Sequence, residues 1–126
     1  MLFRSLQCGA DALSDDPLSG GKLSNRALWA VVEAMRELAP RLLVLGGGGY
    51  NPWSVARAWS GVWATLNRIG IPDVLPAAAE EGLRALTWNR RYDGPLPERW
   101  FTTLADPPNT GPVRERIKEV ATAALA

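Results

Sequence analysis

The spacing of apolar and polar positions predicts a strand, a helix and a second strand in the first 45 residues. Residues 2–8 have the pattern of a short buried strand. Ser24-Asn25 is a helix start, and Pro40 ends that helix. Residues 41–45 are almost continuously apolar, which is typical of a strand buried on both faces. The helix between them carries one apolar stripe, formed by Leu28, Val31, Val32, Met35 and Leu38.

This order of elements predicts an α/β fold. A strand, loop, helix and strand form a βαβ unit, which implies parallel pairing and a right-handed crossover. The first strand runs into Gly9-Ala10-Asp11, and the second runs into Gly46 to Tyr50. Ligands of open α/β sheets bind beyond the carboxyl ends of the strands. We therefore expect Asp11 and Tyr50 on the same rim of the sheet.

A second helix follows the glycine run directly. Asn51 is suited to cap it, and Pro52 occupies its first position. Gly70-Ile71-Pro72 ends it. Helical spacing favours core packing for Trp59 and Trp63. Together with those two tryptophans, its predicted apolar face comprises Val55, Val62, Leu66 and Ile69.

The pattern weakens after residue 70. Residues 77–86 predict a short helix, and residues 113–124 predict a final one with Val113, Ile117, Val120 and Ala124 on one side. Residues 87–108 are rich in proline and contain Trp88, Tyr92, Trp100 and Phe101, whose docking onto the domain is favoured over stacking on a substrate. No repeat or linker divides the chain. We expect one domain segment over 1–126, with a βαβα core in 1–70 and an irregular tail with a terminal helix in 71–126.

Composition narrows the classes of function. The net charge is +1 with acids and bases mixed, which does not favour nucleic-acid or membrane binding. The single cysteine, Cys8, excludes an internal disulfide and favours a cytoplasmic protein. The sequence contains no histidine. This chain alone therefore cannot supply a histidine base, metal ligand or triad member.

The four glycines at 46–49 allow two interpretations, a close-packed corner or a backbone surface that meets a ligand. A dinucleotide fingerprint fails because its third glycine falls on Asn51, and no lysine follows Gly49 as a phosphate loop requires. The next helix could bind an anion at its N-terminus, but the first basic residue is Arg57. Tyr50 could instead donate a hydrogen bond to an oxyanion, and Asp11 is a hard metal ligand or, more ordinarily, a cap.

Four stretches of the sequence together resemble the zinc-dependent histone deacetylase family, which has the arginase/deacetylase fold. The resemblance is greatest to its bacterial, acetoin-utilisation-type branch. It is strongest over residues 6–66, and the spacing from Asp11 to Tyr50, 50 − 11 = 39 positions, agrees with the family's pattern. The stretches are Gln7-Cys8-Gly9-Ala10-Asp11-Ala12-Leu13, Leu23-Ser24, Gly46-Gly47-Gly48-Gly49-Tyr50 and Val55-Ala56-Arg57-Ala58-Trp59.

The resemblance implies a role for four residues. Asp11 matches the family's second zinc-binding aspartate, and Tyr50 matches the tyrosine that stabilises the tetrahedral intermediate. Leu18 matches a wall residue of the acyl-lysine channel, and Gly48 matches a backbone position that lines it. The implied reaction is zinc-dependent hydrolysis of acetyl-lysine in proteins or of a small acetylated amine, with a histidine pair assisting the attack of water.

The chain also departs from the family. The Asp-x-His zinc ligands, the His-His dyad and the monovalent-cation ligands of the family lie upstream of the matched stretch. Asp15 stands where a glycine is usual, and Ser19 where one is common. The chain thus resembles the C-terminal portion of a deacetylase and is expected to be inactive alone, with the missing N-terminal portion as a partner. The alternative is a non-catalytic, truncated or partner-dependent α/β protein.

Overall fold

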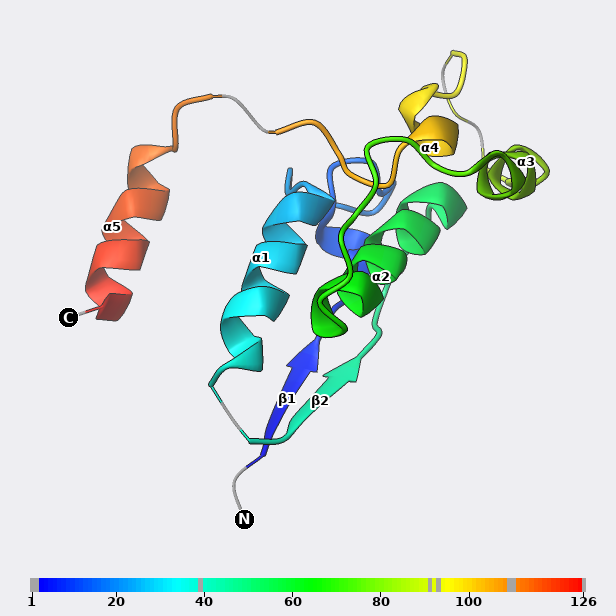
Figure 1. Ribbon diagram of the computed structural model, residues 1–126. Coiled ribbons are helices and arrows are strands. Elements are labelled where there is room, and N and C mark those ends of the chain that lie inside the picture. The colour runs from blue at the N-terminus through cyan, green and yellow to red at the C-terminus, as the bar shows by residue number, and fades with distance from the viewer. Residues whose placement is uncertain (1–2, 39, 91, 93, 109–110, 126) are drawn as a thin grey trace.

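A two-stranded parallel sheet with two helices on one face forms the centre of the protein (Figure 1). The computed structural model describes residues 3–38, 40–90, 92, 94–108 and 111–125. Strand β1 (Arg4–Gln7) pairs with β2 (Leu42–Leu45), with Arg4 opposite Leu42 and Gln7 opposite Leu45. The predicted βαβ unit is therefore confirmed. No helix among the described residues is long and apolar enough to cross a membrane.

Helix α1 (Asn25–Arg36) begins where the sequence predicts. The Ser24 hydroxyl accepts a hydrogen bond from the Ala27 amide at 3.3 Å. The predicted apolar stripe is wrong for Val31 and Leu38, which are exposed. Val32 is buried as predicted, and α1 also buries Trp29. Both pack in one cluster with Leu6 of β1, Val44 of β2 and Val62 of the next helix.

Helix α2 (Pro52–Leu66) is capped by Asn51, as predicted. The Asn51 Oδ1 accepts hydrogen bonds from the Trp53 and Ser54 amides at 3.1 and 3.2 Å. The residue at position 51 is fully buried, so its side chain satisfies amides that water cannot reach.

The prediction of core packing for Trp59 and Trp63 is wrong. Trp59 is 38% exposed and Trp63 is 60% exposed. The small residues of α2 face α1 instead, because a Cβ built on Gly61 would lie 2.0 Å from the Trp29 ring. Close packing of α1 against this glycine turns the two tryptophans away from the interface between the helices.

Strand β2 is covered on one face only within the described residues, which corrects the expectation of a strand buried on both faces. Val44 packs against the core beneath α1 and α2. Leu43 and Leu45 point the other way and are 53% and 47% exposed. The strand therefore alternates between half-buried and exposed positions rather than lying inside a wide sheet.

The segment after α2 contains α3 (Ala77–Arg84), a short helix α4 (Arg99–Thr102) and α5 (Glu115–Leu125). Helix α4 was not predicted. The expected docking of the aromatic tail is confirmed, because Trp100 is fully buried and stacks on Trp53 of α2 with 5.4 Å between ring centroids. Helix α5 buries none of its residues and stands apart from the other helices in Figure 1.

A buried polar network joins the tail to both central helices. Arg57 of α2 is 1% exposed, and its guanidinium lies 2.9 Å from the Asp106 carboxylate. The Arg57 Nε also donates to the Thr103 carbonyl at 2.7 Å. The other Asp106 carboxylate oxygen accepts a hydrogen bond at 2.8 Å from the backbone amide of Asn25, the residue at which α1 begins. One carboxylate therefore holds α1, α2 and the tail together.

Replacing this carboxylate should destabilise the whole fold. Asp106→Ala would leave the Arg57 charge buried without its partner, which costs about 3–5 kcal/mol of the free energy of unfolding. Urea denaturation followed by circular dichroism measures the change. The control is Glu119→Ala, which removes an exposed carboxylate on α5 and should change stability by less than about 0.5 kcal/mol. Equal stability of both variants would show that the buried pair is not a structural support.

Candidate functional site

The loops that follow β1 and β2 lie side by side at the carboxyl edge of the sheet. β1 leads into η1 (Ala10–Ala12), a single 3-10 turn, and β2 leads into the glycine run. Backbone pairing continues past the strands, because the Cys8 amide donates to the Leu45 carbonyl at 2.8 Å. The Ala10 amide then donates to the Gly48 carbonyl at 2.7 Å. The expected common rim for the Asp11 loop and the glycine run is present.

Asp11 lies against the backbone of Gly9 and Gly48, where an added Cβ would displace its carboxylate. A Cβ built on Gly48 would lie 2.2 Å from the Asp11 Oδ2, and one built on Gly9 would lie 2.7 Å from the Oδ1. The rest of the run is equally tight, since a Cβ on Gly47 would lie 2.9 Å from the Gly9 Cα. The interpretation of the glycines as a close-packed corner is therefore confirmed, and their contact with a ligand stays a prediction.

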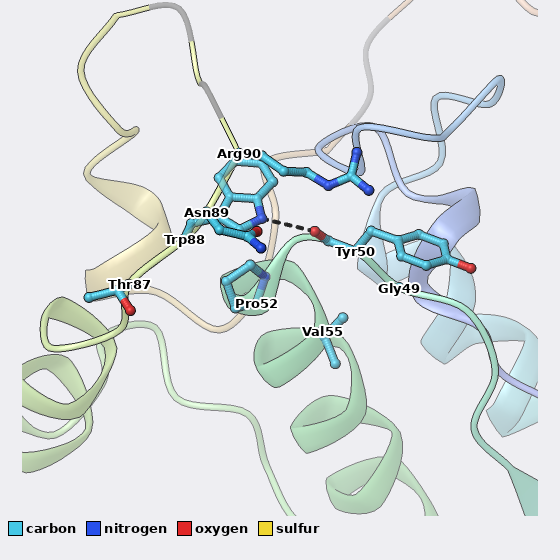
Figure 2. Close-up of a pocket in the computed structure, with 8 residues that line it drawn as sticks. All are labelled: Gly49, Tyr50, Pro52, Val55, Thr87, Trp88, Asn89 and Arg90. Carbon is cyan, nitrogen blue, oxygen red and sulfur yellow. Dashed lines mark hydrogen bonds between the residues drawn. The ribbon is translucent and has the colours of Figure 1, made fainter.

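Tyr50 is fixed by its backbone and leaves its side chain in solvent. Its amide donates to the Asp16 Oδ2 at 2.6 Å, and its carbonyl accepts the Trp88 indole N–H at 3.1 Å. The residue is 45% exposed. Figure 2 shows the phenol extending away from Pro52 and from the Trp88 hydrogen bond. Such a phenol on a fixed backbone is suited to donate a hydrogen bond to a ligand on the rim.

A cleft of about 650 Å³ borders Tyr50 on the side of the tail. Among the described residues that line it, Arg90 is the one that carries a charge, and its guanidinium extends to the same side as the Tyr50 phenol in Figure 2. The sequence suggested tail docking for Trp88 but no contact with Tyr50. The lining residues are Gly49, Tyr50, Pro52, Val55, Thr87, Trp88, Asn89 and Arg90.

Two adjacent aspartates of the loop, Asp15 and Asp16, support the rim, a role that the sequence pattern does not indicate. Asp16 is 5% exposed and accepts the amides of Tyr50 and Leu18, the latter at 2.9 Å. Asp15 faces α4, where its carboxylate accepts from Arg99 and from the Trp100 indole, each at 2.7 Å. The available signal was a pair of acids before Pro17, which does not distinguish solvated charges from buried acceptors.

The residues of this rim do not fit a complete zinc site. Asp11 is a suitable single ligand, but no three His, Cys, Asp or Glu side chains within the described residues are grouped to hold a metal ion. Zinc requires three or four protein ligands, and histidine is lacking from the whole sequence. The Cys8 thiol is 1% exposed, and burial raises its pKa, which disfavours the thiolate that binds metals.

Comparison with known proteins identifies this arrangement. Residues 5–66 match the histone deacetylase domain. Histone deacetylases 2 and 3 of Oryza sativa subsp. japonica are each 50% identical over 54 residues, which cover 43% of this chain and 11% of either relative. The crystal structure of an HDAC homologue from Aquifex aeolicus superposes with a TM-score of 0.84 and 35% identity, over 97% of this chain and 33% of that one.

The chain therefore has an α/β fold similar to part of a histone deacetylase homologue. The chain is similar to the histone deacetylase domain over residues 5–66, just under half of its length. It spans 11–15% of the length of the curated relatives it matches and a third of the Aquifex chain.

The contact between Gly48 and Asp11 can be tested by a double-mutant cycle. Gly48→Ala should cost about 1 kcal/mol of unfolding free energy, because the new methyl group displaces the carboxylate. The cost should be at least halved in an Asp11→Ala background, which removes the carboxylate but keeps the Cβ, and urea denaturation of the four proteins measures both values. The control is Gly70→Ala, which meets no atom within 4 Å. A cost that persists without the Asp11 carboxylate would contradict this assignment.

Proposed function

We propose that this chain carries one part of the active site of a zinc-dependent deacetylase of the acetoin-utilisation branch. The substrate would be acetyl-lysine in a protein or a small acetylated amine. The observation that carries the proposal is the contact of the Asp11 carboxylate with Gly48, two positions before Tyr50 on the same rim. The match to the histone deacetylase domain supports it, as does the similarity to an HDAC homologue complexed with SAHA.

In this proposal Asp11 provides one metal ligand. A bound zinc ion would supply Lewis-acid chemistry for the hydrolysis of an amide. The other ligands and the histidine pair would come from polypeptide outside these 126 residues, because this sequence has no histidine. The exposed Leu43 and Leu45 face of the sheet offers apolar surface for such a partner.

Tyr50 would donate its phenolic hydrogen to the oxyanion that develops on the acetyl carbonyl. A phenol suits this role, since its O–H is a strong hydrogen-bond donor. Its backbone is already held by Asp16 and Trp88, so little ordering remains when substrate binds. Gly48 would line the channel with backbone, and the exposed side chain of Leu18 would form part of its wall.

A second candidate is a non-catalytic, truncated or partner-dependent α/β protein. The observation in its favour is the sequence itself, which holds no histidine for proton transfer. Both candidates place the protein in the cytoplasm, an expectation that rests on the single cysteine.

The purified 126-residue chain should show no zinc-dependent turnover of an acetyl-lysine reporter. The chain offers a single candidate zinc ligand, which is too few to hold the metal, and it has no histidine to act as a base for the attacking water. The assay compares the chain with and without added zinc. Robust turnover that depends on zinc would overturn the need for a complementing segment.

The two candidates differ for the product of the complete reading frame. If the DNA upstream of Met1 encodes, in frame, a His-His pair and an Asp-x-His motif, that product should hydrolyse the reporter. Tyr50→Phe should then lower kcat about 10²–10³-fold, as loss of one oxyanion donor does. The matched control is Tyr92→Phe, which removes the other phenol of the chain and should keep activity. A stop codon upstream, or full activity of Tyr50→Phe, would refute the proposed role.

A further inference from the structure

The backbone of Tyr50 is anchored by a side chain far from it in sequence. Asp16 lies 34 positions earlier, yet its carboxylate accepts the Tyr50 amide at 2.6 Å. A short hydrogen bond to an ionised acceptor is roughly twice as strong as a neutral one. The second carboxylate oxygen accepts the Leu18 amide of its own loop, so the acceptor is held in place.

Two further hydrogen bonds fix the peptide on either side of the Tyr50 side chain. The Tyr50 carbonyl accepts the Trp88 indole N–H, and the Asn51 Nδ2 donates to the Asp15 carbonyl at 2.9 Å. Asn51 is fully buried and also caps α2. The direction in which the Tyr50 side chain leaves the backbone is therefore set by the loop that contains Asp15 and Asp16.

The tail in turn holds that loop. The Asp15 carboxylate accepts hydrogen bonds from the Arg99 guanidinium and from the Trp100 indole N–H, 84 and 85 positions away in the sequence. Trp100 is fully buried against Trp53 in the first turn of α2. The loop thus spans from the start of α2 to α4 and cannot shift without disturbing a buried aromatic stack.

We propose that Asp16 is a positioning residue that sets the direction of the Tyr50 phenol, and that Arg99 acts on Tyr50 through Asp15. The consequence for chemistry rests on the proposed function of Tyr50 as an oxyanion donor. The effect of Asp16 on the direction of the Tyr50 side chain depends only on these contacts. The two neighbouring carboxylates thus have different partners: Asp15 binds the tail, and Asp16 binds the backbone of the rim.

Fluorine NMR of the 126-residue chain labelled with 3-fluorotyrosine tests the geometric part. The chain has two tyrosines, and Tyr92→Phe assigns their signals. Asp16→Ala should shift the Tyr50 signal, leave the Tyr92 signal in place and speed exchange of the Tyr50 amide hydrogen at least about tenfold. Asp16→Asn, which keeps one oxygen acceptor, should give an intermediate result. The control Glu119→Gln removes an exposed carboxylate on α5 and should move neither signal.

A second variant keeps the proposal testable if Asp16→Ala does not fold. Arg99→Gln removes a partly exposed ion pair and should shift the Tyr50 signal in the same direction by a smaller amount. An unmoved Tyr50 signal in a folded Asp16→Ala chain would overturn the proposal. Equal movement of both tyrosine signals would also overturn it, because that indicates general loosening.

Turnover by the complete reading frame tests the chemical part separately. Asp16→Ala should lower kcat about tenfold or more with a smaller effect on KM, and Asp16→Asn should recover part of it. If Asp16→Ala leaves the Tyr50 fluorine signal in place, the positioning role is rejected whatever the activity. Full activity of Tyr50→Phe would reject the proposed function and leave the fluorine result standing.

Discussion

The buried pair of Arg57 and Asp106 is the interaction on which the rest of the structure depends. Desolvation is the largest influence on Arg57 and lowers its pKa, while the charge of Asp106 opposes that shift. A buried guanidinium is costly without a partner of opposite charge, and here the Asp106 carboxylate lies 2.9 Å away while the Thr103 carbonyl accepts a hydrogen bond from the Arg57 Nε. Because Asp106 also binds the Asn25 amide, this one carboxylate fixes where the tail meets the two central helices.

From that point the tail reaches the rim of the sheet. Docking of residues 103–106 brings α4 against α2, where Trp100 stacks on Trp53. Arg99 and Trp100 then meet Asp15, whose neighbour Asp16 binds the Tyr50 amide. The parallel sheet supplies the other half of the arrangement by bringing the Asp11 loop beside Gly48. Local strand pairing and a distant aromatic cluster therefore converge on one short stretch of backbone.

The features of the fold that depend on residues close together in the sequence, or on the pairing of parallel strands, could be predicted from the sequence. The caps Ser24 and Asn51, the βαβ unit and the shared rim of Asp11 and Tyr50 follow from local chemistry and parallel pairing. The buried face of α2 could not be predicted, because the close approach of Trp29 to Gly61 decides which way Trp59 and Trp63 point. The role of Asp16 could not be predicted either, because the sequence does not indicate that its carboxylate accepts a hydrogen bond from an amide 34 positions away.

The close approach of Trp29 to Gly61 limits which substitutions the two central helices can accept. The Trp29 ring occupies the volume that any side chain at position 61 would need, and its indole N–H is committed to the Ala58 carbonyl at 2.9 Å. Neither residue can change alone without loss, because a side chain at position 61 would clash with the ring and a smaller residue at position 29 would leave a cavity. The two positions are therefore coupled, and a paired exchange of a smaller residue at 29 for a larger one at 61 would preserve the packed volume between the helices.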